Sequence, residues 1–178
     1  EMLKHALISD INYWEKLKYF DFHKKKEILT LIKKSIEIKK DITLKDPLER
    51  NLRKTLNFGH TIGHAIESYF MGSSKNEILL HGEAIGIGMI IESYLSNIYC
   101  DFNVTEVNDI KNVFIKIFDK VNFNNSIIKS IYDLLIYDKK NSHGKINFVL
   151  IKKIGEPVID IEVDKKFIIK AFDFYMEK

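Results

Sequence analysis

Apolar residues recur at intervals of three and four along most of the chain, which is the pattern of amphipathic helices packed against one another. The pattern stops at a polar stretch around Pro47 and at a glycine- and serine-containing stretch that begins at Gly72. Near the C-terminus the period changes to two, because Ile159, Ile161 and Val163 alternate with acidic residues as on a half-buried strand. We therefore predict a mainly α, multi-helix domain with a small C-terminal β-hairpin.

The expected elements follow from the same pattern. The predicted helices cover residues 1–7, 10–19, 24–40, 52–70, 81–99, 103–118, 126–137 and 165–176. The predicted hairpin pairs residues 145–151 with residues 157–163. We find no internal repeat and no linker, so we expect one domain over residues 1–178. The chain begins at Glu1, inside a predicted helix, and we therefore interpret it as a fragment of a longer protein.

Composition narrows the functional classes. Hydrophobic residues make up 46% of the chain, but no apolar run is long enough for a signal peptide or a membrane span. The net charge of +3 is spread along the chain, so we do not expect nucleic acid as a partner. The single cysteine, Cys100, excludes an internal disulfide, and we expect a reducing, cytoplasmic location.

The most informative stretch is residues 51–67, NLRKTLNFGHTIGHAIE. Arg53, Asn57, His60 and His64 follow one another there at separations of four, three and four residues. On a continuous helix they share one face, while apolar residues occupy the other directions. We expect this helix to be buried, and a buried polar stripe must find partners.

These histidines are candidate metal ligands. Neutral imidazoles at positions i and i+4, as in His60 and His64, can bind one metal ion, and His81 supplies a third imidazole at a predicted helix start. Gly59 and Gly63 in the same segment indicate close approach of another backbone or a ligand. The alternative is that the histidines are core residues bonded to backbone carbonyls.

Four blocks of sequence resemble 3-dehydroquinate synthases and occur in that family's order. They are EMLKHALI at residues 1–8, LNFGHTIGHAIE at 56–67, LLHGEAIGIGM at 79–89 and YDKK at 137–140. The resemblance implies the C-terminal, helical, metal- and substrate-binding domain of such an enzyme. It also implies an N-terminal NAD-binding domain as partner, which this chain does not contain, and assembly as a homodimer.

The resemblance implies a catalytic metal site. The family's ligands fall on Glu1, His60 and His81, which would hold Zn²⁺ or Co²⁺ with one coordination position open. NAD would be bound mainly by the N-terminal domain. The other three histidines, His5, His23 and His143, match no residue with a chemical role, and we interpret them as surface or packing residues.

The resemblance also assigns residues to the substrate, a phosphorylated sugar acid. The substrate-binding candidates are Lys4, Lys39, Arg53, Asn57, His64, Lys139 and Lys140. It leaves open which of the last two lysines reaches the substrate. Of the catalytic candidates, His64 matches a family histidine near the phosphate, Glu49 matches a carboxylate proposed in proton transfer, and Lys4 matches a lysine that contacts substrate. The segment LKDPLERNLR around Glu49 departs from the family pattern.

The implied reaction converts 3-deoxy-D-arabino-heptulosonate 7-phosphate to 3-dehydroquinate and phosphate, with NAD used and regenerated. Because the hydride acceptor would be held elsewhere, we expect this chain alone to bind metal without turning over substrate. The alternatives are another sugar-phosphate cyclase, a metal-dependent alcohol or glycerol dehydrogenase, or a non-catalytic helical interaction module. Asn57 favours dehydroquinate synthase over the aminocyclitol-forming cyclases, and the lysines around the site disfavour a dehydrogenase.

Overall fold

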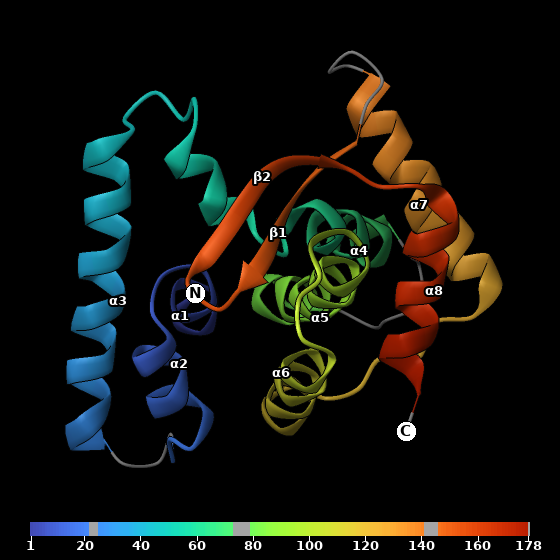
Figure 1. Ribbon diagram of the computed structural model, residues 1–178. Helices are drawn as coiled ribbons and strands as arrows, with labels where there is room; N and C mark the ends of the chain where they lie inside the picture. The colour runs from blue at the N-terminus through green and yellow to red at the C-terminus, as the bar shows by residue number, and fades with distance from the viewer. Residues whose placement is uncertain (22–24, 73–78, 141–145, 178) are drawn as a thin grey trace.

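The computed structural model describes residues 1–21, 25–72, 79–140 and 146–177 (Figure 1). Most of this part is helical and one antiparallel hairpin lies near the C-terminus, which confirms the predicted fold class. None of the helices in the described part combines the length and apolar character that crossing a bilayer requires. The elements in chain order are α1 (Met2–Ser9), α2 (Ile11–Lys18), α3 (Lys25–Lys45), the 3₁₀ helix η1 (Leu52–Asn57), α4 (His60–Gly72), α5 (His81–Cys100), α6 (Val104–Ile117), α7 (Asn125–Lys140), β1 (Asn147–Lys153), β2 (Glu156–Glu162) and α8 (Lys165–Met176).

Helices α4 and α5 form the centre of the molecule, with the other helices and the hairpin arranged around them (Figure 1). They approach closely because glycines line their contact. A Cβ atom on Gly88 of α5 would lie 2.0 Å from the carbonyl oxygen of Gly59, and one on Gly59 would lie 2.3 Å from Cγ of Met89. The close approach that the glycines predicted is therefore confirmed.

The expected continuous helix over residues 52–70 is wrong. The structure has a 3₁₀ helix at Leu52–Asn57, a turn, and then α4 from His60. The break falls at Gly59, whose φ of +80° lies in the left-handed region. The backbone turns there because Phe58 is fully buried and α5 leaves no space for a side chain at position 59. Arg53 and Asn57 therefore do not continue the helical face of His60.

Helix α3 lies at one edge of the molecule and packs on α1 (Figure 1). It extends to Lys45, five residues beyond the predicted end at residue 40. Its buried residues are Leu31, Ser35, Ile38 and Ile42. This stripe, rather than its exposed isoleucines, positions the helix beside α1.

The hairpin confirms the predicted pairing, with both strands shifted by up to two residues. Strand β1 pairs antiparallel with β2, and Phe148 lies opposite Ile161. Its turn is fixed to the N-terminal helix, because the backbone N–H of Gly155 donates to the carbonyl oxygen of Leu7 at 2.8 Å. The hairpin thereby connects the α1 region to the α4–α5 centre, on which β1 also packs.

Candidate metal and anion site

Three imidazoles meet at the junction of α4 and α5. His60 opens α4, His64 follows one turn later, and His81 is the first residue of α5. Each ring offers one nitrogen, and these three nitrogens lie within 4.8 Å of one another. The ring centroids are 5.1 to 5.9 Å apart. A spacing of this kind matches nitrogen ligands that converge on one cation.

The tautomer and the protonation state of His60 suit a metal ligand. Its Nδ1 lies 3.2 Å from the carbonyl oxygen of Phe58, and because a carbonyl only accepts, Nδ1 carries the hydrogen. The unprotonated nitrogen is then Nε2. Burial, followed by the positive charge of Lys4, lowers the pKa of His60 to about 4, so the ring is neutral at neutral pH. A neutral imidazole whose second nitrogen is hydrogen-bonded fits a zinc or cobalt ligand.

His81 is placed by the N-terminus of α5. The Glu83 carboxylate accepts the backbone N–H of Leu80 at 2.8 Å, which fixes the first turn of the helix. The Nδ1 of His81 lies 3.1 Å from Oε2 of Glu67 on α4. Its side chain is 54% exposed, so the carboxylate rather than packing orients the ring.

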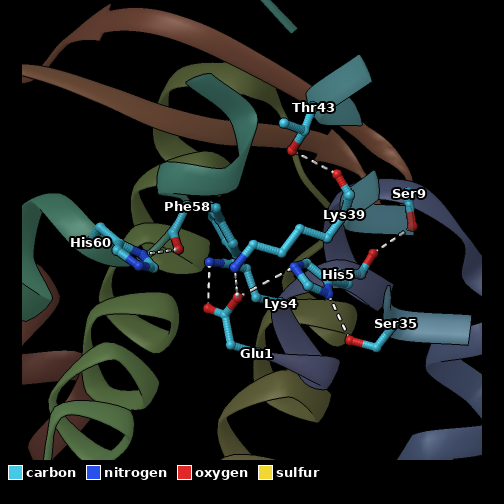
Figure 2. A network of polar contacts seen from close by, with 9 residues as sticks. All are labelled: Glu1, Lys4, His5, Ser9, Ser35, Lys39, Thr43, Phe58 and His60. Carbon is cyan, nitrogen blue, oxygen red and sulfur yellow. Dashed lines mark hydrogen bonds and ion pairs between the residues drawn. The ribbon is translucent and has the colours of Figure 1, made fainter. Parts of the chain in front are cut away.

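A second group of charged side chains gathers where α1 faces α3 (Figure 2). The Lys4 ammonium donates to Oε1 of Glu1 at 2.7 Å, and the Lys39 ammonium reaches Oε2 at 3.3 Å. Lys4 is 3% exposed, and this burial lowers the pKa of its ammonium. Two predicted anion-binding lysines therefore do lie together, close enough to the imidazoles for Lys4 to influence His60.

His5 is a residue whose role the sequence analysis missed. It is 2% exposed, its Nδ1 lies 2.7 Å from the Ser35 hydroxyl, and its Nε2 faces Oε2 of Glu1 at 3.4 Å (Figure 2). The His5 imidazole and the Lys4 ammonium hold the pKa of the Glu1 carboxyl well below its usual range. The only available signal was that a histidine within an apolar helical stretch needs a polar partner.

The third group comes from the loop that departs from the family pattern. The carboxylate of Asp46 accepts the backbone N–H groups of Arg50, Asn51 and Arg53, which orders the turn into η1. These hydrogen bonds lower the pKa of Asp46, that from Asn51 most. The loop thereby faces the side chain of Glu49 toward η1.

The ordered loop brings Glu49 to two of the predicted substrate residues. The Asn57 amide donates to Oε1 of Glu49 at 2.9 Å, and Nε of Arg53 lies 3.7 Å from Oε2. The guanidinium of Arg53 also donates to the carbonyl oxygen of Pro47 at 3.0 Å. Three residues that the resemblance assigns to substrate and proton transfer are therefore neighbours.

A cavity of about 750 Å³ extends from His60 and His64 to this loop. Four of the predicted or candidate site residues line it, Glu49, Asn57, His60 and His64. The remaining wall comes from η1, α4, α7 and the hairpin. Its residues are Lys54, Thr61, Ala65, Ser68, Leu134, Leu135, Tyr137, Asn147, Phe148, Val149 and Asp160. Such a volume, lined by both polar and apolar side chains, is typical of a small-molecule site.

Glu92 is a second residue that the sequence analysis missed. It is fully buried in α5, and its carboxylate accepts the backbone N–H of Gly59 at 2.6 Å and that of Ile62 at 3.3 Å. These two donors flank His60 at the start of α4. A carboxylate at a helix N-terminus satisfies free N–H groups and interacts favourably with the helix dipole. Glu92 therefore fixes the turn that presents His60.

The structure thus distributes the predicted site residues over three neighbouring groups. His60 and His81 meet, but the third member of their cluster is His64, which is exposed, rather than Glu1. Glu1 contacts Lys4, His5 and Lys39 instead, and its role as a ligand stays a prediction. The side chains of Lys139 and Lys140, and the residues His23 and His143, lie outside the described part of the chain.

Comparison with known proteins agrees with this arrangement. The chain matches the family 3-dehydroquinate synthase C-terminal over residues 1–141. The 3-dehydroquinate synthase of Parabacteroides distasonis is 36% identical over 99% of this chain and 50% of its own length. That of Listeria welshimeri is 40% identical over 89% of the chain and 44% of its own length. The chain spans about half the length of the curated relatives it matches.

Solved structures of sugar-phosphate cyclases share the fold. The 2-epi-5-epi-valiolone synthase of Streptomyces hygroscopicus, with NAD⁺ and Zn²⁺ bound, has a TM-score of 0.76 at 21% identity and covers 98% of this chain and 49% of its own. A 2-deoxy-scyllo-inosose synthase complexed with carbaglucose-6-phosphate, NAD⁺ and Co²⁺ has a TM-score of 0.74 at 25% identity, covering 96% and 48%. From the family match and the curated relatives together, this chain belongs to the 3-dehydroquinate synthase C-terminal family.

Proposed function

We propose that residues 1–178 form the C-terminal, metal- and substrate-binding domain of a 3-dehydroquinate synthase. The convergence of three imidazoles next to a group of cationic side chains is the observation that supports this most strongly. The reaction is the conversion of 3-deoxy-D-arabino-heptulosonate 7-phosphate to 3-dehydroquinate with loss of phosphate. Curated relatives of this name cover nearly the whole chain.

The proposed metal ligands are Glu1, His60 and His81, with zinc or cobalt as the ion. The two imidazoles fit this role, because His60 is neutral and the Nδ1 atoms of both rings are engaged in hydrogen bonds, whereas Glu1 would have to exchange a contact with Lys4, His5 or Lys39 for the metal ion. When bound, such an ion lowers the pKa of a substrate hydroxyl and polarises the carbonyl formed from it. The solved cyclases with Zn²⁺ or Co²⁺ support this choice of ion.

The remaining residues would bind and orient the substrate. The Arg53 guanidinium can hold a carboxylate through two parallel hydrogen bonds, whereas Lys4 and Lys39 act as point charges toward carboxylate or phosphate. Both Asn57 and His64 line the cavity, where His64 would lie by the phosphate and Asn57 would orient the substrate. Lys139 and Lys140 remain proposed substrate contacts.

Glu49 is the proposed proton-transfer residue. Its hydrogen bond from Asn57 and its proximity to Arg53 place a carboxylate on the same cavity wall as His60 and His64. A carboxylate in this position could accept a proton from a substrate carbon or hydroxyl. NAD would be held mainly by an N-terminal domain outside this chain, and homodimer assembly and a cytoplasmic location belong to the same proposal.

Metal titration tests the centre directly. Wild type should bind about one zinc ion per chain, and His60→Ala and His81→Ala should each weaken binding by more than about 100-fold. His143→Ala, which changes a histidine without an assigned role, serves as the control. Wild-type affinity in both ligand variants would reject the proposed centre.

Two further variants test the third ligand. If Glu1 is the ligand, Glu1→Gln should weaken zinc binding more than His64→Ala does, and the reverse order would assign the position to His64. Turnover should be absent from the isolated chain and should appear when an N-terminal domain is supplied. A panel of sugar phosphates in that reconstituted enzyme separates a dehydroquinate synthase from the other cyclases.

A further inference from the structure

Glu67 extends the histidine face of α4 by one turn. His60, His64 and Glu67 follow one another at separations of four and three residues, so they lie on one side of the helix. The Glu67 side chain is 24% exposed. It therefore borders the three-imidazole cluster without being one of the three groups that converge there.

The contact between Glu67 and His81 determines which nitrogen of His81 is free. Oε2 of Glu67 lies 3.1 Å from Nδ1 of His81. A carboxylate oxygen that faces an imidazole nitrogen accepts its hydrogen bond, so Nδ1 carries a hydrogen, and in the neutral ring, the form that binds a metal ion, Nε2 keeps its lone pair. The contact therefore leaves Nε2 as the nitrogen of a neutral His81 that is available to a metal ion.

His60 reaches the same tautomer by a different route. Its Nδ1 donates to the backbone carbonyl of Phe58, which no substitution of a side chain can remove. His81 depends on a side chain from another helix, and its own exposure of 54% leaves the ring little constraint from packing. A single substitution, at Glu67, can therefore remove the hydrogen bond that orients the His81 ring, whereas no side-chain substitution removes the one that orients His60.

We propose that Glu67 is a positioning residue of the metal centre: it fixes the tautomer and orientation of His81 and does not itself contact the cation. This rests on the proposed function, in which His81 is a ligand. Carboxylates that accept a hydrogen bond from a ligating imidazole typically contribute 10- to 100-fold to metal affinity. Glu67 also joins α4 to the first residue of α5 through this hydrogen bond.

Zinc or cobalt affinity, measured by competition with a chelator, is the first readout. Glu67→Ala should weaken binding by about 10- to 100-fold. Glu67→Gln should lose less, because a carboxamide oxygen still accepts from Nδ1. Glu37→Ala, which removes an exposed glutamate of α3, should bind as wild type and serves as the matched control.

The protonation of the ring nitrogens in the metal-free protein is the second readout. In ¹⁵N spectra, His81 of wild type should carry its hydrogen on Nδ1, and Glu67→Ala should shift it toward a mixture of tautomers. This measurement needs no metal. It therefore tests the Glu67 contact even if the proposed metal centre fails because His60→Ala and His81→Ala bind zinc as wild type does.

A double variant separates positioning from ligation or general damage. In a His81→Ala background, Glu67→Ala should cause no additional loss of affinity, because the group that it positions is absent. Unchanged affinity and an unchanged tautomer in the single variant would overturn the proposal. An equally large loss in the His81→Ala background would also overturn it, because Glu67 would then act independently of His81.

Discussion

His60 and Lys4 belong to the same candidate site, but different kinds of contact hold them in place. The turn before His60 is fixed by glycine packing and by two backbone hydrogen bonds to the buried Glu92. Lys4 and Lys39 are held by ion pairs to Glu1, whose side chain is 49% exposed. The backbone that carries His60 should therefore be rigid and coupled to folding, whereas the exposed Lys39–Glu1 pair should adjust to a ligand at little cost in stability.

The largest expected effect comes from Gly88→Val, which disrupts the close packing of α4 against α5. A Cβ at this position would lie 2.0 Å from the carbonyl oxygen of Gly59 and 2.9 Å from the backbone nitrogen of Gly63, so α4 and α5 must separate. We expect a loss of about 3 kcal/mol in the free energy of unfolding. Denaturant unfolding followed by circular dichroism measures it.

Gly82→Ala is the matched control for that substitution, because a Cβ on Gly82 of the same helix has no neighbour within 4 Å. It should leave stability unchanged or raise it by up to about 1 kcal/mol, since alanine is the better helix former. Equal stability of Gly88→Val and Gly82→Ala would contradict the close α4–α5 contact.

A smaller loss is expected when the buried carboxylate is removed. Glu92→Ala leaves the N–H groups of Gly59 and Ile62 without this acceptor and opens a cavity, which should cost about 2 kcal/mol. Glu92→Gln keeps one acceptor oxygen and should lose about half as much. If the alanine variant were as stable as wild type, the turn before His60 would not depend on this carboxylate.

The pKa of His60 predicts a smaller effect that depends on pH. Folding lowers this pKa from 6.5 to about 4, so the unfolded chain binds more protons between these values, and stability must fall as the pH drops through that interval. After allowance for solvent screening of a partly exposed ring, we expect a loss of about 1 kcal/mol.

His60→Gln provides the reference for that measurement, because its amide does not titrate. Unfolding of both proteins should be followed between pH 4 and 6.5 in the presence of a chelator. The stability of wild type relative to the variant should decrease toward low pH. Parallel pH profiles would mean that the folded protein does not disfavour a charged imidazole at this position.

The same contrast explains how far the sequence could predict the site. The spacing of His60 and His64 and the position of His81 at a helix start are local features, and each was visible in the sequence. The contacts of Glu92 with Gly59 and of Glu67 with His81 depend on how α4 and α5 approach each other. Local periodicity carries no information about that approach.

Prediction of the fold from the sequence was limited in the same way. The hydrophobic period predicted the helices and the hairpin, but it did not predict the break at Gly59 or which face of α3 is buried, and both have physical causes outside that pattern. The break at Gly59 came from the proximity of Met89, which lies far along the chain. On α3 two apolar stripes were available, and contact with α1 buried the one containing Ser35, whose partner is His5. A polar contact between two helices, which the apolar periodicity does not predict, therefore accompanies the buried face of α3.

The smallest expected effect on stability comes from a substitution of Lys39, which forms an exposed ion pair with Glu1. Lys39 and Glu1 form an ion pair at 3.3 Å with side-chain exposures of 58% and 49%, so Lys39→Met should change the free energy of unfolding by less than about 0.5 kcal/mol. Its effect on an anion should be larger, since a ligand phosphate would approach this ammonium. We expect affinity for inorganic phosphate to fall roughly fivefold, or about 1 kcal/mol.

Lys40→Met distinguishes a local contact from a change in net charge, because Lys40 is the exposed neighbour of Lys39 on α3 and the two variants carry the same total charge. Calorimetric titration with phosphate should show weaker binding for Lys39→Met and wild-type binding for Lys40→Met. Equal weakening in both would mean that phosphate responds only to the overall positive charge. A loss of phosphate affinity in Lys39→Met alone, together with unchanged stability, would show that Lys39 serves ligand binding and not folding. The segment around His60, in contrast, is expected to contribute to folding as well.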